Sequence, residues 1–179
     1  MPSTPTTPLS IHLLTALTAC SGPASQCKQF AEITQQSADI RSQFDSEIES
    51  AQISASGAQS LEELQAAAKE YTAAVDTLTQ KLDTMRQSFE GINIDDAQLS
   101  EHRESYLLFI SESKTALTEA GKAMQLVIDA KTEAEFKAVF GDFTAQANRA
   151  FGEIQTLDTE EETIIDAFNT YCEVELGVS

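Results

Sequence analysis

Apolar side chains recur three and four positions apart along most of the chain after residue 27, with polar residues between them. This spacing is typical of amphipathic helices, which gather such residues on one face. Four segments carry the pattern. The apolar face of the first contains Phe30, Ile33, Ser37, Ile40, Phe44, Ile48 and Ala51, and that of the second contains Leu64, Ala68, Tyr71, Val75, Leu78, Leu82, Met85 and Phe89.

The last two segments continue the same spacing. The apolar face of the third contains Tyr106, Ile110, Leu117, Met124 and Val127, with Phe109 and Ile128 beside it. That of the fourth contains Phe136, Phe140, Phe143, Ala147, Phe151 and Ile154, and then Phe168 and Cys172. A helix-start signal at Asp158 interrupts the fourth segment. We expect one long helix, bent or broken near Asp158, and a short fifth helix is the alternative.

Local signals divide these helices at short loops. Gly57 and Gly91 follow the first two segments as natural helix ends. Ser60 with Glu63, and Thr132 with Glu135, have the spacing of capping boxes, and Asp95 is the expected N-cap of the third helix. The chain has no proline after residue 23. The sequence therefore predicts an all-α domain, an antiparallel up-down-up-down four-helix bundle, over residues 27–175.

The formal net charge of −18 belongs entirely to the chain after residue 19, because residues 1–19 contain no Asp, Glu, Lys or Arg. An acidic body of this kind repels nucleic-acid phosphates and anionic lipid surfaces. It favours solubility and cationic partners or divalent ions. A well-solvated surface without any partner explains the charge equally well. The charge therefore argues against nucleic-acid binding but does not identify a partner.

The first twenty residues have a different character. Residues 9–19 form a mostly apolar run, too short to cross a bilayer as a mature helix, and it ends in Leu17-Thr-Ala-Cys20. This ending resembles the lipobox of bacterial lipoproteins. The resemblance implies a signal peptide over residues 1–19, lipidation of Cys20, and a tether over residues 20–26. The alternative is a disordered N-terminal arm in which Cys20 is incidental.

The lipoprotein resemblance implies a chain anchored to a bacterial membrane and facing the periplasm, a lumen or the exterior. Disulfides form in such compartments. Once Cys20 carries lipid, Cys27 and Cys172 remain as an even pair. An antiparallel bundle of four helices brings its two ends together, so we expect a disulfide between Cys27 and Cys172. Two free cysteines are the alternative.

The chain contains little that is typical of catalysis. It has no glycine-rich phosphate loop, no nucleophile elbow and no paired E-x-x-H motif. His102 could in principle bind haem together with Met85, although a packed helical histidine is the simpler interpretation. The acidic run at 158–162 lacks the alternating ligands of a calcium loop and suits the first turn of a helix. Arg103 and Lys114 could pair with acids or extend into solvent.

These observations leave two classes of function. The first is a membrane-anchored, non-enzymatic bundle that binds or scaffolds another protein, with no cofactor and no nucleic-acid partner. The second is a carrier of a small ligand or a cofactor such as haem between its helices. For the second class the phenylalanine-rich face is the candidate ligand surface, and it contains Phe136, Phe140, Phe143 and Phe151.

Overall fold

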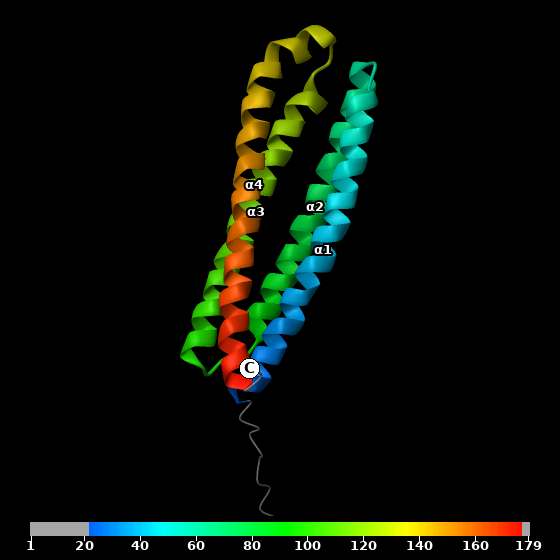
Figure 1. Ribbon diagram of the computed structural model, residues 1–179. Helices are drawn as coiled ribbons and strands as arrows, with labels where there is room; N and C mark the ends of the chain where they lie inside the picture. The colour runs from blue at the N-terminus through cyan, green and yellow to red at the C-terminus, as the bar shows by residue number, and fades with distance from the viewer. Residues whose placement is uncertain (1–21, 177–179) are drawn as a thin grey trace, which may run out of the picture.

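The computed structural model describes residues 22–176 of the protein. They form four α-helices: α1 (Pro23–Gly57), α2 (Leu61–Gly91), α3 (Ala97–Asp129) and α4 (Glu133–Leu176). The helices run alternately up and down as an elongated bundle, and the two chain ends of the described part lie at the same end (Figure 1). The predicted all-α fold and its antiparallel topology are confirmed. We call the end that holds Cys27 and Cys172 the terminal end, and the opposite end the distal end.

Polar side chains begin three of the helices. The Ser60 hydroxyl accepts a hydrogen bond from the Glu63 N–H (3.2 Å), and the Thr132 hydroxyl accepts one from the Glu135 N–H (3.2 Å), as predicted. At the start of α3 the prediction was wrong by one residue. The N-cap is Asp96, whose carboxylate accepts from the Leu99 N–H (2.8 Å), because the preceding loop continues one residue further than the spacing indicated.

The fourth helix is continuous. It runs for 44 residues and passes Asp158 without a break, so the preferred expectation of one long helix is correct and no fifth helix begins there. Thr159, part of the expected start signal, instead bonds through its hydroxyl to the Gln155 carbonyl one turn earlier (3.5 Å). The helix is about 66 Å long at 1.5 Å per residue, so one element connects both ends of the bundle.

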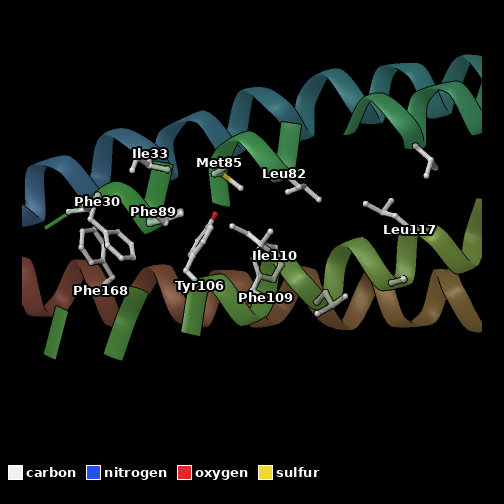
Figure 2. Packing of buried hydrophobic residues seen from close by; sticks show 14 of the residues in the cluster. Phe30, Ile33, Leu82, Met85, Phe89, Tyr106, Phe109, Ile110, Leu117 and Phe168 are labelled. Atoms are coloured by element: carbon white, nitrogen blue, oxygen red, sulfur yellow. The ribbon is translucent and has the colours of Figure 1, made fainter. Parts of the chain in front are cut away.

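Aromatic side chains fill the terminal half of the core. Phe30 stacks on Phe168 with ring centroids 4.1 Å apart, and it meets the edges of Phe89 and Tyr106 at 4.8 and 6.1 Å. These four side chains come from four different helices and are at most 1% exposed. Figure 2 shows them together, followed by Met85, Ile110 and Leu82 toward the distal end. All four helices are therefore packed together at the terminal end.

The helices separate unevenly toward the distal end. α2 and α3 stay in contact there, since the Gln65 amide donates to the carbonyl oxygens of Val127 (3.2 Å) and Ala130 (2.6 Å). α1 and α4 diverge (Figure 1), and in the described part no hydrogen bond or ion pair joins them beyond Arg41. The inward faces of Phe44 and Ile154 are consequently only half-buried. The bundle is open along the line between α1 and α4.

Candidate functional site

A cavity of about 290 Å³ lies where α1 and α4 begin to separate. All four helices contribute to its walls. Its apolar lining consists of Ile40, Phe44, Leu78, Leu82, Phe109, Leu117, Ile154 and Leu157, and its polar lining consists of Ser37, Arg41, Asp45, Ser113, Asp158 and Glu161. The volume is at the small end of the range for ligand pockets, and the combination of apolar walls with a few polar groups is typical of them.

A buried carboxylate closes the cavity toward the terminal end. Glu161 is only 3% exposed. It accepts hydrogen bonds from the hydroxyls of Ser37 (2.6 Å) and Tyr106, and it forms an ion pair with the Arg41 guanidinium. A buried charge is stable only when it is paired and its lone pairs are hydrogen-bonded, and these three donors provide that. The network links α1, α3 and α4 where α1 and α4 begin to separate.

Negative charge dominates the polar side of the cavity. Its ionisable residues are one cation, Arg41, and three carboxylates: Asp45, Asp158 and Glu161. Arg41 also reaches Asp158 at 3.3 Å. Burial is the main cause that raises the pKa of Asp158; Arg41 opposes it, and the negative charges of Glu161 and Asp45 add to it. The lining therefore holds three carboxylates against one arginine.

The Tyr106 hydroxyl belongs to the same network. Burial raises its pKa strongly, and the negative charge of Glu161 adds to the effect. Tyr106 therefore stays protonated at physiological pH and donates its proton to Glu161. It acts here as a fixed hydrogen-bond donor.

A second hollow continues outward from the cavity. It has a volume of about 340 Å³ and lies on the surface between α1 and α4. Ser37, Arg41, Asp45 and Glu161 line both spaces. The Arg41 side chain, 37% exposed, therefore stands between the interior and this outer groove. The groove adds a further carboxylate, that of Glu162, to the negative side of the opening.

The phenylalanine-rich face of α4 lies elsewhere, near the distal end. Phe136, Phe140 and Phe143 contact one another with ring centroids 5.6 to 6.5 Å apart, and we call these three residues the distal aromatic cluster. Phe140 is 52% exposed, whereas the spacing of three and four positions had placed it on the packed face of the helix. That part of the prediction was wrong, because α1 does not cover α4 at this level.

Phe151, the fourth candidate ligand-facing residue, belongs to different surroundings. It is half-buried, and its ring meets Tyr71 of α2 at 6.0 Å, edge to face. None of the four phenylalanines is among the residues that line the 290 Å³ cavity. The sequence thus identified an exposed aromatic surface, but not the interior cavity.

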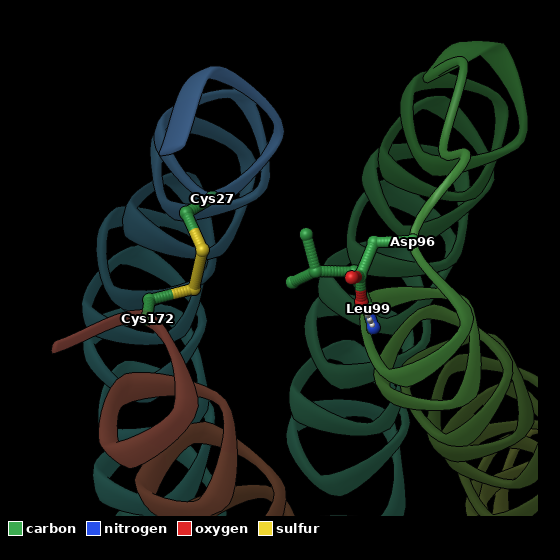
Figure 3. Close-up of a disulfide and its surroundings, with 4 residues drawn as sticks. All are labelled: Cys27, Asp96, Leu99 and Cys172. Carbon is green, nitrogen blue, oxygen red and sulfur yellow. Dashed lines mark hydrogen bonds between the residues drawn. A yellow bond between two sulfur atoms is a disulfide. The ribbon is translucent and has the colours of Figure 1, made fainter. Parts of the chain in front are cut away.

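The two cysteines expected to pair do so. Cys27 and Cys172 form a disulfide between the start of α1 and the end of α4, with Cα atoms 5.8 Å apart (Figure 3). Close by, the Leu99 N–H and the Tyr171 hydroxyl donate to Asp96, which lowers the pKa of this carboxyl. The predicted lipidation site, Cys20, and the predicted signal peptide lie outside the described residues.

The other singled-out residues have structural surroundings. The His102 ring packs against Phe168 (6.2 Å) and Tyr171 (5.9 Å). Met85 is 1% exposed in the core, and neither His102 nor Met85 lines the cavity. Lys114 pairs with Asp83 of α2. The Arg103 guanidinium donates to the Ile92 carbonyl (3.3 Å) in the loop before α3.

The sequence analysis did not predict the residues that form the polar side of the cavity. Arg41 stands alone in an otherwise acidic and neutral helix face, and Glu161 is one of four acids in the run at 158–162. A helical register alone could have found Glu161, because it lies seven positions before Phe168 and so shares its inward face. The acidity of its neighbours concealed that position.

Within residues 22–176 no three His, Cys, Asp or Glu side chains are arranged so that they could hold a metal ion. None of the four described helices combines the length and apolar character needed to cross a bilayer. No protein-family model, curated protein or solved structure matches the chain.

Proposed function

We propose that this protein is a lipid-anchored bundle on the outer side of a bacterial membrane that binds another protein and performs no catalysis. The anchor is Cys20, seven residues before Cys27 at the terminal end. The distal aromatic cluster is the binding surface. The observation that carries this proposal is the position of the cluster: an exposed phenylalanine ring with two aromatic neighbours, at the end of the bundle far from the anchor.

The geometry supports a binding role in two ways. Phe140 lies 32 positions before Cys172 on one continuous helix, which is about 48 Å along its axis. A surface at that height is clear of a membrane to which the terminal end is tethered. Exposed aromatic side chains are enriched at protein interfaces, where they supply large contact areas. The acidic body favours a partner whose apolar contact surface is surrounded by basic residues.

Crosslinking in native membranes tests this proposal. The wild-type protein and Phe140→Ser are captured with their crosslinked partners, and Leu108→Ser serves as the matched control. Leu108 is also exposed (58%) but lies on α3, away from the cluster. We expect Phe140→Ser to lose a partner that wild type and Leu108→Ser retain. A partner captured equally by all three proteins would contradict binding through this cluster.

A carrier of a small ligand is the second candidate function, and the 290 Å³ cavity favours it. This function does not exclude the first, because the cavity and the distal aromatic cluster share no residue. The haem version of this candidate has less support, because His102 and Met85 do not line the cavity.

A further inference from the structure

No side chain of the described residues fills the interior cavity. It extends between Phe44 of α1, Leu78 of α2 and Phe109 of α3, and its volume equals that of about ten water molecules in the liquid. Its apolar walls offer water few hydrogen-bond partners, whereas an apolar molecule would bury the half-exposed faces of Phe44 and Leu78. The cavity therefore suits the apolar body of a small ligand.

The polar side of the cavity determines which charge such a ligand carries. Arg41 already pairs with Glu161 and Asp158. Asp45 has no ion-pair or hydrogen-bond partner in the described part of the chain, and its charge helps to raise the pKa of Asp158. A cation between Asp45 and Asp158 would relieve this repulsion, whereas an anion would add a fourth negative charge to the lining.

We propose that the cavity binds a small amphiphile with an apolar body and a single amine or other cationic group. The body lies between the apolar walls, and the cation lies at the opening, near Asp45 and Asp158. The opening joins the cavity to the outer groove, so a ligand can enter from the surface between α1 and α4. This inference rests on the carrier candidate above.

Three probes with the same ten-carbon chain test the charge of the ligand: n-decylamine, n-decanol and decanoate. They are titrated into the full chain carrying Cys20→Ser, which cannot be lipidated, with the disulfide intact. Methyl NMR signals of Ile40, Leu78 and Leu117 report on the cavity walls. We expect decylamine to shift these signals, decanol to bind more weakly, and decanoate to bind least.

Charge-removing variants test the place of the cation. Asp45→Asn combined with Asp158→Asn is compared with Asp39→Asn combined with Asp166→Asn. The second pair removes two exposed carboxylates from the same two helices, away from the cavity. We expect the first pair to weaken decylamine binding roughly five- to thirty-fold, and the control pair to change it less than about twofold. Equal weakening by both pairs would overturn the placement of the cation.

The outcomes separate this inference from the carrier function itself. If decanoate or decanol shifts the wall signals at lower concentration than decylamine, the cavity binds ligands but the cationic class is wrong. If none of the three probes shifts the wall signals, both the cationic ligand class and the carrier function are contradicted. Ser113→Leu places extra volume in the cavity and serves as a second check. It should abolish the decylamine shifts while the circular dichroism spectrum stays that of the folded bundle.

Discussion

Arg41 of α1 and Glu161 of α4, 120 positions apart in the chain, form an ion pair at the point where the two helices begin to diverge. Toward the terminal end the helices pack through Phe30 and Phe168 and are joined by the disulfide. Toward the distal end they leave the cavity and its opening between them. The pair therefore marks the boundary between the closed and the open part of the bundle.

Removing the arginine should destabilise the fold. Arg41→Met leaves the Glu161 carboxylate buried with only two hydroxyl donors, Ser37 and Tyr106. We expect the free energy of unfolding to fall by about 1–3 kcal/mol, less than for a fully buried pair because Arg41 is partly solvated. Urea denaturation monitored by circular dichroism measures it. Arg86→Met, which removes an exposed pair with Glu90, is the control and should cost below about 0.5 kcal/mol.

Two buried tyrosines should differ in how the loss of their hydroxyl changes the free energy of unfolding. Tyr106 donates to Glu161, and Tyr106→Phe should lower the free energy of unfolding by about 1.5–3 kcal/mol. The Tyr71 hydroxyl is buried without a hydrogen-bond partner among the described residues, and burial raises its pKa to about 12. Tyr71→Phe should therefore be neutral or stabilising. The two variants remove the same atom, so equal losses in denaturation experiments would refute the network around Glu161.

The pattern of apolar positions was sufficient to predict the fold, because helix packing depends mainly on which face of each helix is apolar. Ile110 and Phe89 are fully buried where their spacing placed them. The same pattern could not predict that α1 and α4 diverge. That separation depends on the relative tilt of two helices that are 75 residues apart in the chain, and spacing within one helix carries no information about it. Phe140, exposed despite its regular position, is the visible consequence.

The site was harder to predict than the fold for a related reason. Whether an acid is buried depends on a partner that lies far away in the sequence, and Glu161 is buried because Arg41, Ser37 and Tyr106 meet it from two other helices. Its composition does not distinguish it from Glu160 or Glu162, which are exposed; only its helical register, seven positions before Phe168, sets it apart. The proximity of Cys27 and Cys172 was predictable because it follows from topology: an even number of antiparallel helices returns the chain to its starting end.

Asp158 should give the protein a measurable pH dependence. Its pKa is raised in the folded state, so folding favours the protonated form, and this contribution to stability is lost as the pH rises through the raised pKa. At pH 7, Asp158→Asn should stabilise the fold slightly, by less than about 1 kcal/mol because the side chain is more than half exposed. The gain should vanish near pH 3, where the wild-type carboxyl is protonated in both states. Thermal melts of the wild type and Asp158→Asn across this pH range measure the difference.

The proposed lipidation of Cys20 can be tested separately. The run that ends in Leu17-Thr-Ala-Cys20 should be removed, so that the mature protein begins at a diacylated Cys20 and partitions with membranes. Cys20→Ser should accumulate uncleaved or leave the membrane fraction, while its helical content stays unchanged. Intact mass spectrometry of protein from native membranes is the measurement, and an unmodified Cys20 there would rule out the anchor.

The disulfide should stabilise the bundle without being required for its helices. Cys27 and Cys172 are 145 positions apart, and closing such a loop removes about 5 kcal/mol of unfolded-state entropy in the simple chain model, which is an upper value. Reduction should therefore lower the melting temperature by up to roughly 10–20 °C. Helicity at 25 °C should persist, because Phe30 and Phe168 still pack α1 against α4 and α2 and α3 keep their own contacts.

Thermal melts with and without a reducing agent, followed by circular dichroism, measure this effect. Combined replacement, Cys27→Ser with Cys172→Ser, is the control that separates the disulfide from other effects of the reducing agent, and its melting temperature should equal that of the reduced protein. A non-reducing peptide map of protein from its native compartment decides whether the bond forms there. Free thiols at both positions would contradict the disulfide. Loss of helicity on reduction would instead show that the aromatic packing at the terminal end cannot hold α1 against α4 without the covalent bond.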